Sequence, residues 1–338
     1  MKPTRTDVAK LAGVSTATVS NVLNRPDIVA EETAMKVRSA IEQLGYRPNM
    51  IARSLAIKRT MQIGIILEDI CNPFFGEIVR EFENAANEKG YFVNICTGLH
   101  KLDSYLDDFV ARSLDGIFVT ALPYRYNLNK IYNLVEKGVK VVVSGNINVN
   151  TSLVSSIEND YVSAMHDVVK YLYDLGHTEI AYLSGLGREL TYDLRCIGYK
   201  KSLVEFGLPY RDSLLIDGKY PYTTNIEDGY KCALRLMESG EDFTAVICGN
   251  DLMALGAMKA FQEKGYQIPK DISVVGFDGI TLSIFFDPVL TTMSVDKIKL
   301  GRKAFELLYS NIMHGSTGQY INKLTMRIGG STARSRKA

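Results

Sequence analysis

Several features common in secreted, membrane and metal-binding proteins are missing from this sequence of 338 residues. No apolar run approaches the roughly 18 residues that a membrane-spanning helix needs, and the N-terminal segment MKPTRTDVAKLAGVS lacks the apolar core of a secretory signal. The five cysteines are scattered and never spaced C-x-x-C, which disfavours a disulfide framework or a zinc site. We therefore expect a cytoplasmic protein that makes no membrane contact.

Catalytic and cofactor-binding motifs are also missing. The four histidines have no metal-ligand spacing, and the sequence contains no Walker A, G-x-S-x-G or H-E-x-x-H motif. The segment GLGREL, residues 185–190, meets only part of the G-x-G-x-x-G dinucleotide pattern. His177 is expected to cap or pack against a helix end. We expect neither an enzyme nor a bound cofactor.

The charge is unevenly distributed along a chain of otherwise ordinary globular composition, 46% hydrophobic and 23% charged. Residues 1–60 contain ten basic and five acidic residues, a net charge of +5, whereas the remainder carries 29 basic and 33 acidic residues, a net charge of −4. A basic head on a mildly acidic body is typical of a DNA-reading module joined to a ligand-sensing module. A chance fluctuation on a solvated face would produce the same charge pattern.

The first 60 residues predict three helices and no strand. A short amphipathic run over residues 7–12 ends at Gly13, Ser15 can cap a second helix over residues 16–23, and a third helix covers about residues 31–44. Gly45 ends the third helix, and the proline that follows favours an extended link. The apolar positions of the three helices are Val8, Ala9, Leu11 and Ala12; Ala17, Val19, Val22 and Leu23; and Val37, Ile41 and Leu44.

The strongest functional signal is the segment TDVAKLAGVSTATVSNVLN, residues 6–24. Two short helices joined by a glycine-containing turn fit a helix-turn-helix, whose second helix reads bases in the major groove from its N-terminal end. Thr16, Ala17, Ser20 and Asn21 face outward there. Asparagine can bond an adenine edge, alanine can contact a thymine methyl, and threonine or serine can do either. A helical hairpin with no DNA role is the alternative.

From Met61 onward, short apolar runs alternate with amphipathic helical stretches. Apolar, β-branched runs between helices of ten or more residues predict parallel strands buried on both faces. Their number favours two doubly wound lobes, with a break near Asp160. The first nine runs are residues 62–67, 92–98, 116–122, 140–145, 154–160, 180–185, 213–218, 245–251 and 272–278.

Three further segments complete the predicted α/β core. Residues 290–296 are expected to return to the first lobe as a strand, and a helix is expected over residues 298–312. The final run, residues 324–330, is expected to close the second lobe. Lobe 1 then comprises about residues 61–160 and 291–322, and lobe 2 about residues 161–290 and 323–338.

These motifs, in this order and spacing, resemble the LacI/GalR family of transcriptional regulators. The resemblance continues through EETAMKVRSAIEQLGYRPNMIARSLA (31–56) and IGIILEDICNPFFGEIVREFE (63–83) to ICGNDLMALGAM, ISVVGFDGI and LTTMSVD, so it covers nearly the whole chain. It implies an all-α helix-turn-helix head over residues 1–48, a hinge helix and linker over 49–60, and a periplasmic-binding-protein-like core of two doubly wound parallel-sheet lobes over 61–338. It also implies a repressor.

The resemblance implies a DNA surface on the head and hinge. The family's hinge helix orders on operator DNA and wedges a leucine, here Leu55, between base pairs of the minor groove. A plain linker is the alternative. One departure is Ala30, where the family usually has a serine or threonine cap, at a cost of about 1 kcal/mol. The expected DNA-binding residues are Thr6, Ser15, Thr16, Ala17, Thr18, Ser20, Asn21, Asn24, Tyr46, Asn49, Arg53 and Leu55.

The resemblance also implies an effector in the cleft between the lobes, where polar residues follow the carboxyl ends of strands. Arg195 and Asp278 would clamp vicinal hydroxyls or a charged group, because a guanidinium offers a planar fork of donors and a carboxylate offers acceptors. Asn250 would bond a further hydroxyl, and Phe74 or Phe75 could stack on a ring. The expected effector-binding residues are Asn72, Phe74, Asp160, Arg195, Tyr220, Asn250 and Asp278.

Some of these residues have simpler alternatives. Phe75 is a candidate for the core, and Asp251 is expected to cap the helix over residues 252–261. Val295 stands where many sugar-responsive members carry glutamine, which leaves the ligand open. A protein corepressor also stays open, as do the operator and the sign of the response.

The expected partners are operator DNA, a sugar-like small-molecule effector and a second copy of the chain. The sequence has no heptad run after STARSRKA, so we expect a homodimer without a tetramerising coiled coil. Two other classes of protein share the doubly wound scaffold. A transporter's solute-binding protein would need a signal peptide and has no use for residues 6–58, and an enzyme would need catalytic motifs.

Overall fold

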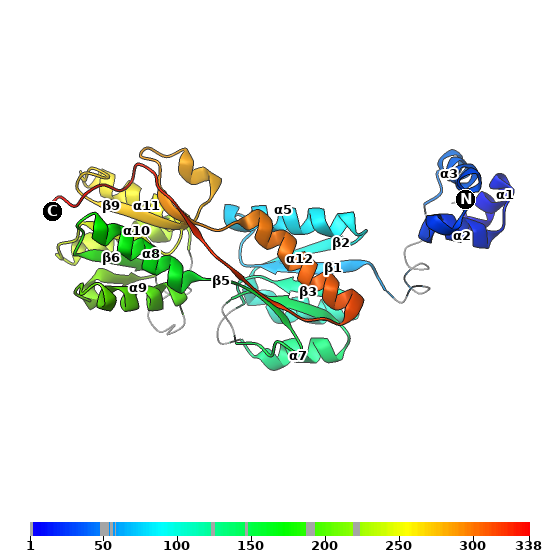
Figure 1. Cartoon of the computed structure of the whole chain (residues 1–338), viewed down its shortest axis with the longest axis horizontal. Helices are drawn as coiled ribbons and strands as arrows, with labels where there is room; N and C mark the ends of the chain where they lie inside the picture. Colours follow the sequence, from blue (N-terminus) through cyan, green and yellow to red (C-terminus); the bar gives the residue numbers. More distant parts are fainter. Residues whose placement is uncertain are drawn as a thin grey trace. The chain divides into compact units, whose positions relative to one another are not determined.

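The computed structural model describes residues 3–47, 54, 57, 59–122, 126–145, 148–186, 193–218 and 224–338. The chain divides into two compact units, Met1–Thr60 and Met61–Ala338 (Figure 1). Four predicted site residues lie outside the described residues: Asn49, Arg53, Leu55 and Tyr220. No helix in the described ranges is long and apolar enough to cross a membrane.

The first unit, the head, consists of helices around one small core. The helices are α1 (Arg5–Ala12), α2 (Thr16–Asn24) and α3 (Glu31–Leu44), with a single 3-10 turn, η1 (Pro26–Ile28). Their buried side chains come from all three α-helices and the segment that follows them. They are Val8, Ala9, Val19, Val22, Ala34, Val37, Ala40 and Tyr46. The three predicted helices are therefore confirmed.

The first helix differs from the prediction in two details. It begins two residues earlier because Thr4 and Asp7 form a capping box: the Thr4 Oγ1 accepts from the Asp7 amide at 3.4 Å, and the Asp7 carboxylate accepts from the Thr4 amide at 2.8 Å. Leu11 was expected to face inward, but it is half exposed. The core side of α1 is narrow because only Val8 and Ala9 are buried on this short helix.

Local capping chemistry defines the helix-turn-helix. Gly13 ends α1 with φ 67°, a left-handed conformation that a side chain would strain. The Ser15 Oγ then accepts from the Thr18 amide at 3.0 Å and begins α2, as predicted. Helix α3 begins after Ala30 with no side-chain cap, so the departure seen in the sequence leaves its first amides without that partner.

In the second unit, lobe 1 is built on a parallel sheet. The strand order is β11-β5-β4-β3-β1-β2, and every neighbouring pair is parallel. The strands are β1 (Gln62–Leu67), β2 (Phe92–Thr97), β3 (Gly116–Val119), β4 (Lys140–Val143), β5 (Ser155–Asn159) and β11 (Gln319–Asn322). The helices are α5 (Pro73–Glu88), α6 (Leu102–Ala111), α7 (Leu128–Glu136) and α12 (Lys297–His314), with a 3-10 turn, η2 (Leu99–Lys101).

Lobe 2 repeats this architecture with one reversal. Its strand order is β12-β10-β9-β8-β6-β7, parallel except for the antiparallel pair of β10 and β12. The strands are β6 (Ile180–Ser184), β7 (Leu215–Asp217), β8 (Ala245–Cys248), β9 (Ser273–Asp278), β10 (Thr291–Ser294) and β12 (Thr325–Arg327). The helices are α8 (Tyr161–Asp174), α9 (Leu194–Glu205), α10 (Ile226–Glu238) and α11 (Asp251–Glu263), with 3-10 turns η3 (Asp212–Leu214) and η4 (Thr281–Ile284).

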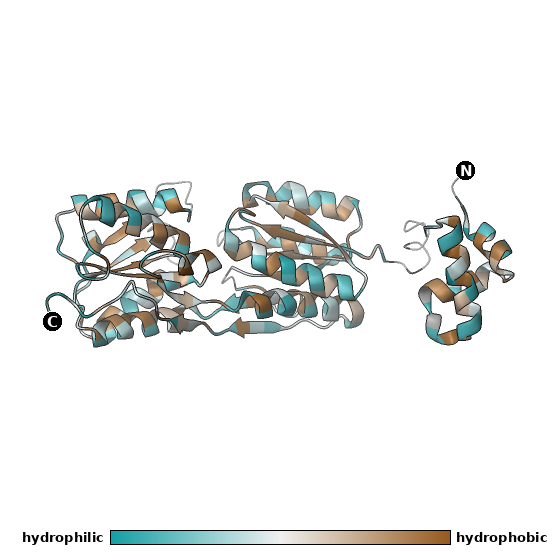
Figure 2. Ribbon diagram, turned by 90° about the horizontal axis from the view of Figure 1, so that it is seen from above, coloured by the Kyte–Doolittle hydropathy of each residue, from teal (hydrophilic) through white to brown (hydrophobic). Residues whose placement is uncertain are grey.

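Each sheet is buried on both faces by helices. In lobe 1, Ile63 and Ile65 pack with Phe82 of α5 and Phe305 of α12, while Ile66 faces the opposite core with α6 and α7. Lobe 2 likewise has one core against α10 and α11 and another against α8 and α9. Figure 2 shows the apolar strands between helices whose surfaces are largely hydrophilic. The predicted pair of doubly wound lobes is confirmed.

The prediction for residues 290–296 was wrong. That segment stays in lobe 2, where β10 pairs with β9 and Thr292 lies opposite Gly276. The chain enters lobe 1 only at α12, and the unpredicted β11 then adds to the lobe 1 sheet. The sequence of a four-residue strand does not show which of two sheets the strand will join. The lobes are therefore linked at three points, which we call the first (159–161), second (295–297) and third (322–325) crossings.

Restoring the missing cap should stabilise the head. In Ala30→Ser, the new hydroxyl can accept a hydrogen bond from an amide of the first turn of α3, worth about 1 kcal/mol. The amides of α3 that exchange through local opening should then exchange about fivefold more slowly, a factor that follows from this energy. Hydrogen exchange on the full chain measures this. The control Ala30→Val adds volume without a cap and should not slow exchange; equal rates in Ala30→Ser and the parent would refute the prediction.

Candidate functional site

Polar residues stand at the carboxyl ends of β1, β5 and β8, and each caps the following helix. The Asn72 Oδ1 accepts from the Phe74 amide at 3.0 Å, and the Asp160 Oδ1 accepts from the Ser163 amide at 3.2 Å. The Asn250 Oδ1 accepts from the Met253 amide at 2.9 Å. The Asn250 Nδ2 also donates to the Thr224 carbonyl at 2.9 Å. Both ends of the Asn250 amide are thus engaged, and a ligand hydroxyl would have to compete with these bonds.

Asp251 was expected to cap α11, but Asn250 is the cap and Asp251 is fully buried. Its carboxylate accepts from the Ile280 amide at 2.8 Å and from the Thr292 hydroxyl at 2.5 Å. Burial raises the pKa of Asp251 to about 7, although both hydrogen bonds oppose the shift. Asp251 therefore joins the ends of β8, β9 and β10 beneath the site.

Of Phe74 and Phe75, only Phe74 is partly accessible. Phe75 is buried in the core of lobe 1, which confirms the simpler alternative for it. Phe74 packs edge-on against Phe75 with ring centroids 5.2 Å apart and stays partly accessible. Phe74 is the aromatic ring of this segment that a ligand can reach.

Arg195 is nearly buried at the start of α9. Its Nη1 donates to the Gly249 carbonyl at 2.6 Å, and its guanidinium carbon lies 4.7 Å from the ring centroid of Tyr161. Its Nε lies 3.5 Å from the Asp193 carboxylate, but it is buried without a hydrogen-bond partner among the described residues. An unsatisfied buried donor of this kind favours a ligand acceptor.

Asp193 is a residue that the sequence interpretation missed. It caps α9 by accepting from the Arg195 amide at 3.1 Å, and its other oxygen accepts from the hydroxyls of Tyr182 at 3.0 Å and Ser184 at 3.3 Å. Burial, and then the Asp193 charge, raises the pKa of Tyr182 well above its usual value, so Tyr182 stays a neutral donor. The available signal was an aspartate two residues before Arg195, at the predicted helix start.

A buried chain of polar contacts connects Arg195 to two of the crossings. The Tyr161 hydroxyl accepts from the Asn159 Nδ2 at 3.1 Å, and the Asn159 Oδ1 accepts from the Asn322 Nδ2 at 3.0 Å. Burial raises the pKa of Tyr161 to about 12, so its ring stays neutral beneath the guanidinium. Arg195 is therefore linked to the first crossing through Asn159 and to the third through Asn322.

Asp278 ends β9 with its side chain 5% exposed and φ at 101°, a strained conformation for a residue with a Cβ. Burial, and then the nearby Asp251 carboxyl, raises the pKa of Asp278 to about 8, against the opposing charges of Arg195 and Lys297. No described residue donates a hydrogen bond to its carboxyl group. Arg195 and Asp278 together offer donors and acceptors in one nearly buried place.

In the head, the predicted DNA-reading residues differ in accessibility. Those at the start of α2 are the most accessible, whereas Tyr46 packs in the head's core, and its DNA contact stays a prediction. The side chain of Asn24 is outside the described residues. The exposed members are Thr6, Ser15, Thr16 and Ala17, and the half-buried members are Thr18, Ser20 and Asn21.

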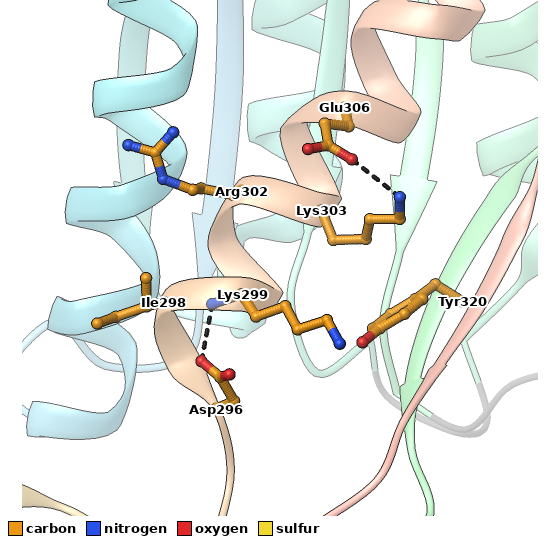
Figure 3. Close-up of a pocket in the computed structure, with 7 residues that line it drawn as sticks. All are labelled: Asp296, Ile298, Lys299, Arg302, Lys303, Glu306 and Tyr320. Carbon is orange, nitrogen blue, oxygen red and sulfur yellow. Dashed lines mark hydrogen bonds and ion pairs between the residues drawn. The ribbon is translucent and has the colours of Figure 1, made fainter.

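A surface pocket of about 410 Å³ lies elsewhere, between the start of α12 and β11 (Figure 3). Its charged groups have protein partners: the Lys303 Nζ is 2.9 Å from the Glu306 carboxylate, the Asp296 carboxylate accepts from the Lys299 amide at 2.9 Å, and Arg302 pairs with two glutamates of α5. The Lys299 ammonium also lies 5.6 Å from the ring of Tyr320. None of the predicted effector-binding residues lines this pocket.

His177 has the packing role that was predicted. It follows α8, where its ring nitrogens lie 2.8 Å from the Thr244 hydroxyl and 3.0 Å from the Ala333 carbonyl. Burial lowers its pKa, so the ring stays neutral. His177 joins the C-terminal segment to lobe 2.

The raised pKa of Asp278 predicts how stability depends on pH. A carboxyl whose folded-state pKa exceeds its unfolded value stabilises the fold fully below about pH 4, and this contribution is lost as pH rises towards 8. The unfolding free energy of the Met61–Ala338 unit should therefore fall between pH 5 and 8, by up to about 1.4 kcal/mol per pH unit for each such group.

Denaturant unfolding of the full chain at several pH values measures this slope. Asp278→Asn should reduce it, leaving the part due to Asp251. The control Asp167→Asn, which removes an exposed carboxylate on α8, should keep the slope of the parent chain. A full slope in Asp278→Asn would contradict the assignment.

Comparison with known proteins agrees with this architecture. Residues 4–49 match the model for bacterial regulatory proteins of the lacI family, and residues 60–328 match the model for periplasmic binding proteins and the sugar-binding domain of the LacI family. The chain is 38% identical over 310 residues to an HTH-type transcriptional repressor PurR of Histophilus somni, covering 90% of this chain and 91% of that protein. A PurR of Pasteurella multocida is 36% identical over 312 residues, with coverage of 90% and 91%.

Two solved structures extend the similarity to three dimensions. The lac repressor dimer bound to operator and the anti-inducer ONPF has a TM-score of 0.83 and 26% identity, covering 98% of this chain and all of that one. A complex of the transcriptional regulator CelR with cellobiose has a TM-score of 0.71 and 26% identity, covering 97% and 99%. The chain belongs to the LacI family of bacterial regulatory proteins and is a DNA-binding transcriptional regulator of that family.

Proposed function

We propose that this protein represses transcription by binding a near-palindromic operator as a homodimer, under the control of a sugar or sugar derivative bound between its lobes. The observation that carries the ligand part is the nearly buried Arg195, at the start of α9, together with the buried Asp278 at the end of β9. Charged groups are costly to bury unless they are paired or bind a ligand. The head and the family relatives support the DNA part.

In this proposal, α2 reads the operator in the major groove. Thr16 and Ala17 lie exposed at its first turn, and Ser20 and Asn21 lie one turn further on the same helix. Such side chains can contact base edges, while the helix N-terminus and nearby hydroxyls contact phosphates. The hinge residues Asn49, Arg53 and Leu55 complete the proposed DNA surface. A solute-binding protein would have no use for this head.

The proposed ligand chemistry follows from the donors of Arg195 and the carboxyl group of Asp278. A cation would meet the charge of Arg195, whereas a neutral polyol can accept from the guanidinium and donate to the carboxyl group. Half-buried Phe74 and the Tyr161 ring add apolar surface suited to a sugar face. The similar CelR structure with cellobiose supports this class of ligand.

Dimerisation is proposed to use apolar side chains exposed on both lobes. Phe92 is 67% exposed on β2, the edge strand of the lobe 1 sheet, and Ile95 follows on the same strand. In lobe 2, Phe285 is 77% exposed beside Leu282 and Ile284 on η4. Exposed apolar clusters and open sheet edges are features of protein interfaces.

Charge placed on these surfaces should separate the subunits. Phe92→Glu and Phe285→Glu should each shift the sedimentation coefficient towards that of a monomer, because a carboxylate would have to be buried in the interface. Operator affinity should fall at least about 100-fold, since the second head no longer binds intramolecularly. Val204→Glu, at a 78% exposed position on α9, is the matched control and should remain dimeric. Unchanged sedimentation of both phenylalanine variants would exclude these surfaces.

Ligand binding should be detectable as thermal stabilisation. A panel of sugars, sugar phosphates, nucleosides and purines is tested with the full chain, and a ligand at 100 times its Kd should stabilise the native state by about 2.7 kcal/mol, or raise Tm by roughly 5 °C or more. Arg195→Ala should abolish that shift while keeping operator affinity within about twofold.

The result of this panel decides between ligand classes. A response confined to sugars supports the proposal, and a response confined to purines would overturn the sugar assignment while keeping the site. Arg195→Ala that still responds to the ligand would exclude the proposed site.

A further inference from the structure

Lys297 is the first residue of α12, at the second crossing, and it is only 5% exposed. Lysine is almost never fully buried without partners. A cation at the first turn of a helix also faces the positive end of the helix dipole, which is unfavourable. Neither burial nor the helix explains why a lysine stands here, so its function has to come from what its ammonium group contacts.

The Lys297 ammonium binds the turn that follows β9. Its Nζ donates to the carbonyls of Asp278 at 3.0 Å, Gly279 at 2.9 Å and Val295 at 3.3 Å. These three bonds use all three donors of the ammonium. Asp278 and Gly279 both have positive φ, 101° and 65°, so Lys297 contacts the two residues whose backbone is left-handed. For Asp278 this conformation persists only if its surroundings hold it.

The other side of the same turn is fixed from within lobe 2. The Gly279 amide lies 3.3 Å from the Thr292 hydroxyl, and the Ile280 amide donates to the Asp251 carboxylate at 2.8 Å. Lobe 2 therefore holds the amides of the turn, and Lys297, which belongs to a lobe 1 helix, holds its carbonyls. The contact from Lys297 crosses between the lobes.

Lobe 1 also contributes a counter-charge. The Glu77 carboxylate on α5 lies 4.0 Å from the Lys297 Nζ, and it accepts from the Thr281 hydroxyl of lobe 2 at 3.4 Å. Helix α12 is packed closely on α5: a Cβ at Gly301 would lie 2.5 Å from the Ile78 carbonyl oxygen. Lys297 and Glu77 are thus held together in lobe 1, and both contact the segment that follows Asp278.

We propose that Lys297 is a positioning residue that holds the turn after β9 from lobe 1 and so keeps the Asp278 carboxyl directed at the ligand site. The inference rests on the proposed role of Asp278 in ligand binding. In this arrangement the ligand site is complete only while the two lobes keep their contact at the second crossing. Glu77 stabilises that contact by balancing the Lys297 charge and by binding Thr281.

The first test is the hydrogen-exchange rate of the Gly279 and Ile280 amides in the full chain. Lys297→Met should raise both rates at least roughly tenfold, and Lys297→Arg, which keeps a cationic donor, should restore most of the protection. The Glu77 side chain is partly exposed. Glu77→Gln should raise the two exchange rates less than Lys297→Met does, and it keeps the test usable if Lys297→Met folds poorly. Unchanged rates at both amides in Lys297→Met or Glu77→Gln would overturn the proposal.

The second test separates positioning from a purely structural role. The titratable and charged groups facing Asp278 are Tyr161 on α8, Arg195 on α9, Asp251 on α11 and Lys297 on α12, with Glu77 of α5 beside Lys297. Lys297→Met, which removes the charge, should move the pH range over which stability is lost upward by roughly 0.5–1 pH unit. In an Asp278→Asn background, the same substitution should leave that pH range unchanged. A uniform loss of stability at every pH would show a structural role only.

Neither test uses a ligand. The positioning role can therefore fail while a sugar still binds at Arg195, and the ligand panel can fail while the Lys297 results hold. The two proposals are tested separately.

Discussion

The Met61–Ala338 unit depends on one constraint: its buried charged groups need partners. Arg195 and Lys297 are nearly buried, and a buried charge without partners costs several kcal/mol. Each obtains partners from backbone carbonyls: Gly249 for Arg195, and Asp278, Gly279 and Val295 for Lys297. The partners of Arg195 lie within lobe 2, whereas Lys297 begins the lobe 1 helix α12 and reaches carbonyls of lobe 2 and of the second crossing. The Lys297 charge is therefore satisfied only when the two lobes are joined.

This arrangement connects the proposed ligand site to the crossings between the lobes. Arg195 reaches the first and third crossings through Tyr161, Asn159 and Asn322, and Asp278 reaches the second through Lys297. In the proposed function, a ligand that bonds to both Arg195 and Asp278 would contact groups that are linked to all three crossings. If the proposed ligand changes operator affinity, operator binding must change ligand affinity by the same factor. The polar contacts described above connect the proposed ligand-binding residues to the crossings within the Met61–Ala338 unit.

The sequence predicted the architecture well because the signals for it are local. Strand β1 has its predicted bounds, and Ser15 and Gly13 delimit the helix-turn-helix through capping chemistry that any short segment reveals. The sheet to which β10 belongs could not be predicted, because its pairing depends on β9 and β12. The roles of Asp193 and Lys297 were missed for a similar reason. The partners of Lys297 are distant in the sequence, the counter-charge Glu77 most of all, and a lysine or aspartate at a helix start is usually a solvated charge or a simple cap.

The most direct test of a buried Asp278 as the ligand's acceptor is proton release on binding. Calorimetric titration with the sugar found by the panel, near pH 7 in buffers of different ionisation enthalpy, measures it. Burial raises the pKa of Asp278 to about 8, so its carboxyl is largely protonated at this pH, and a hydroxyl donor stabilises the ionised form. We predict that binding releases up to about one proton and that Asp278→Asn abolishes the release. Binding without proton release, or equal release in the variant, would contradict the assignment of Asp278 to the ligand site.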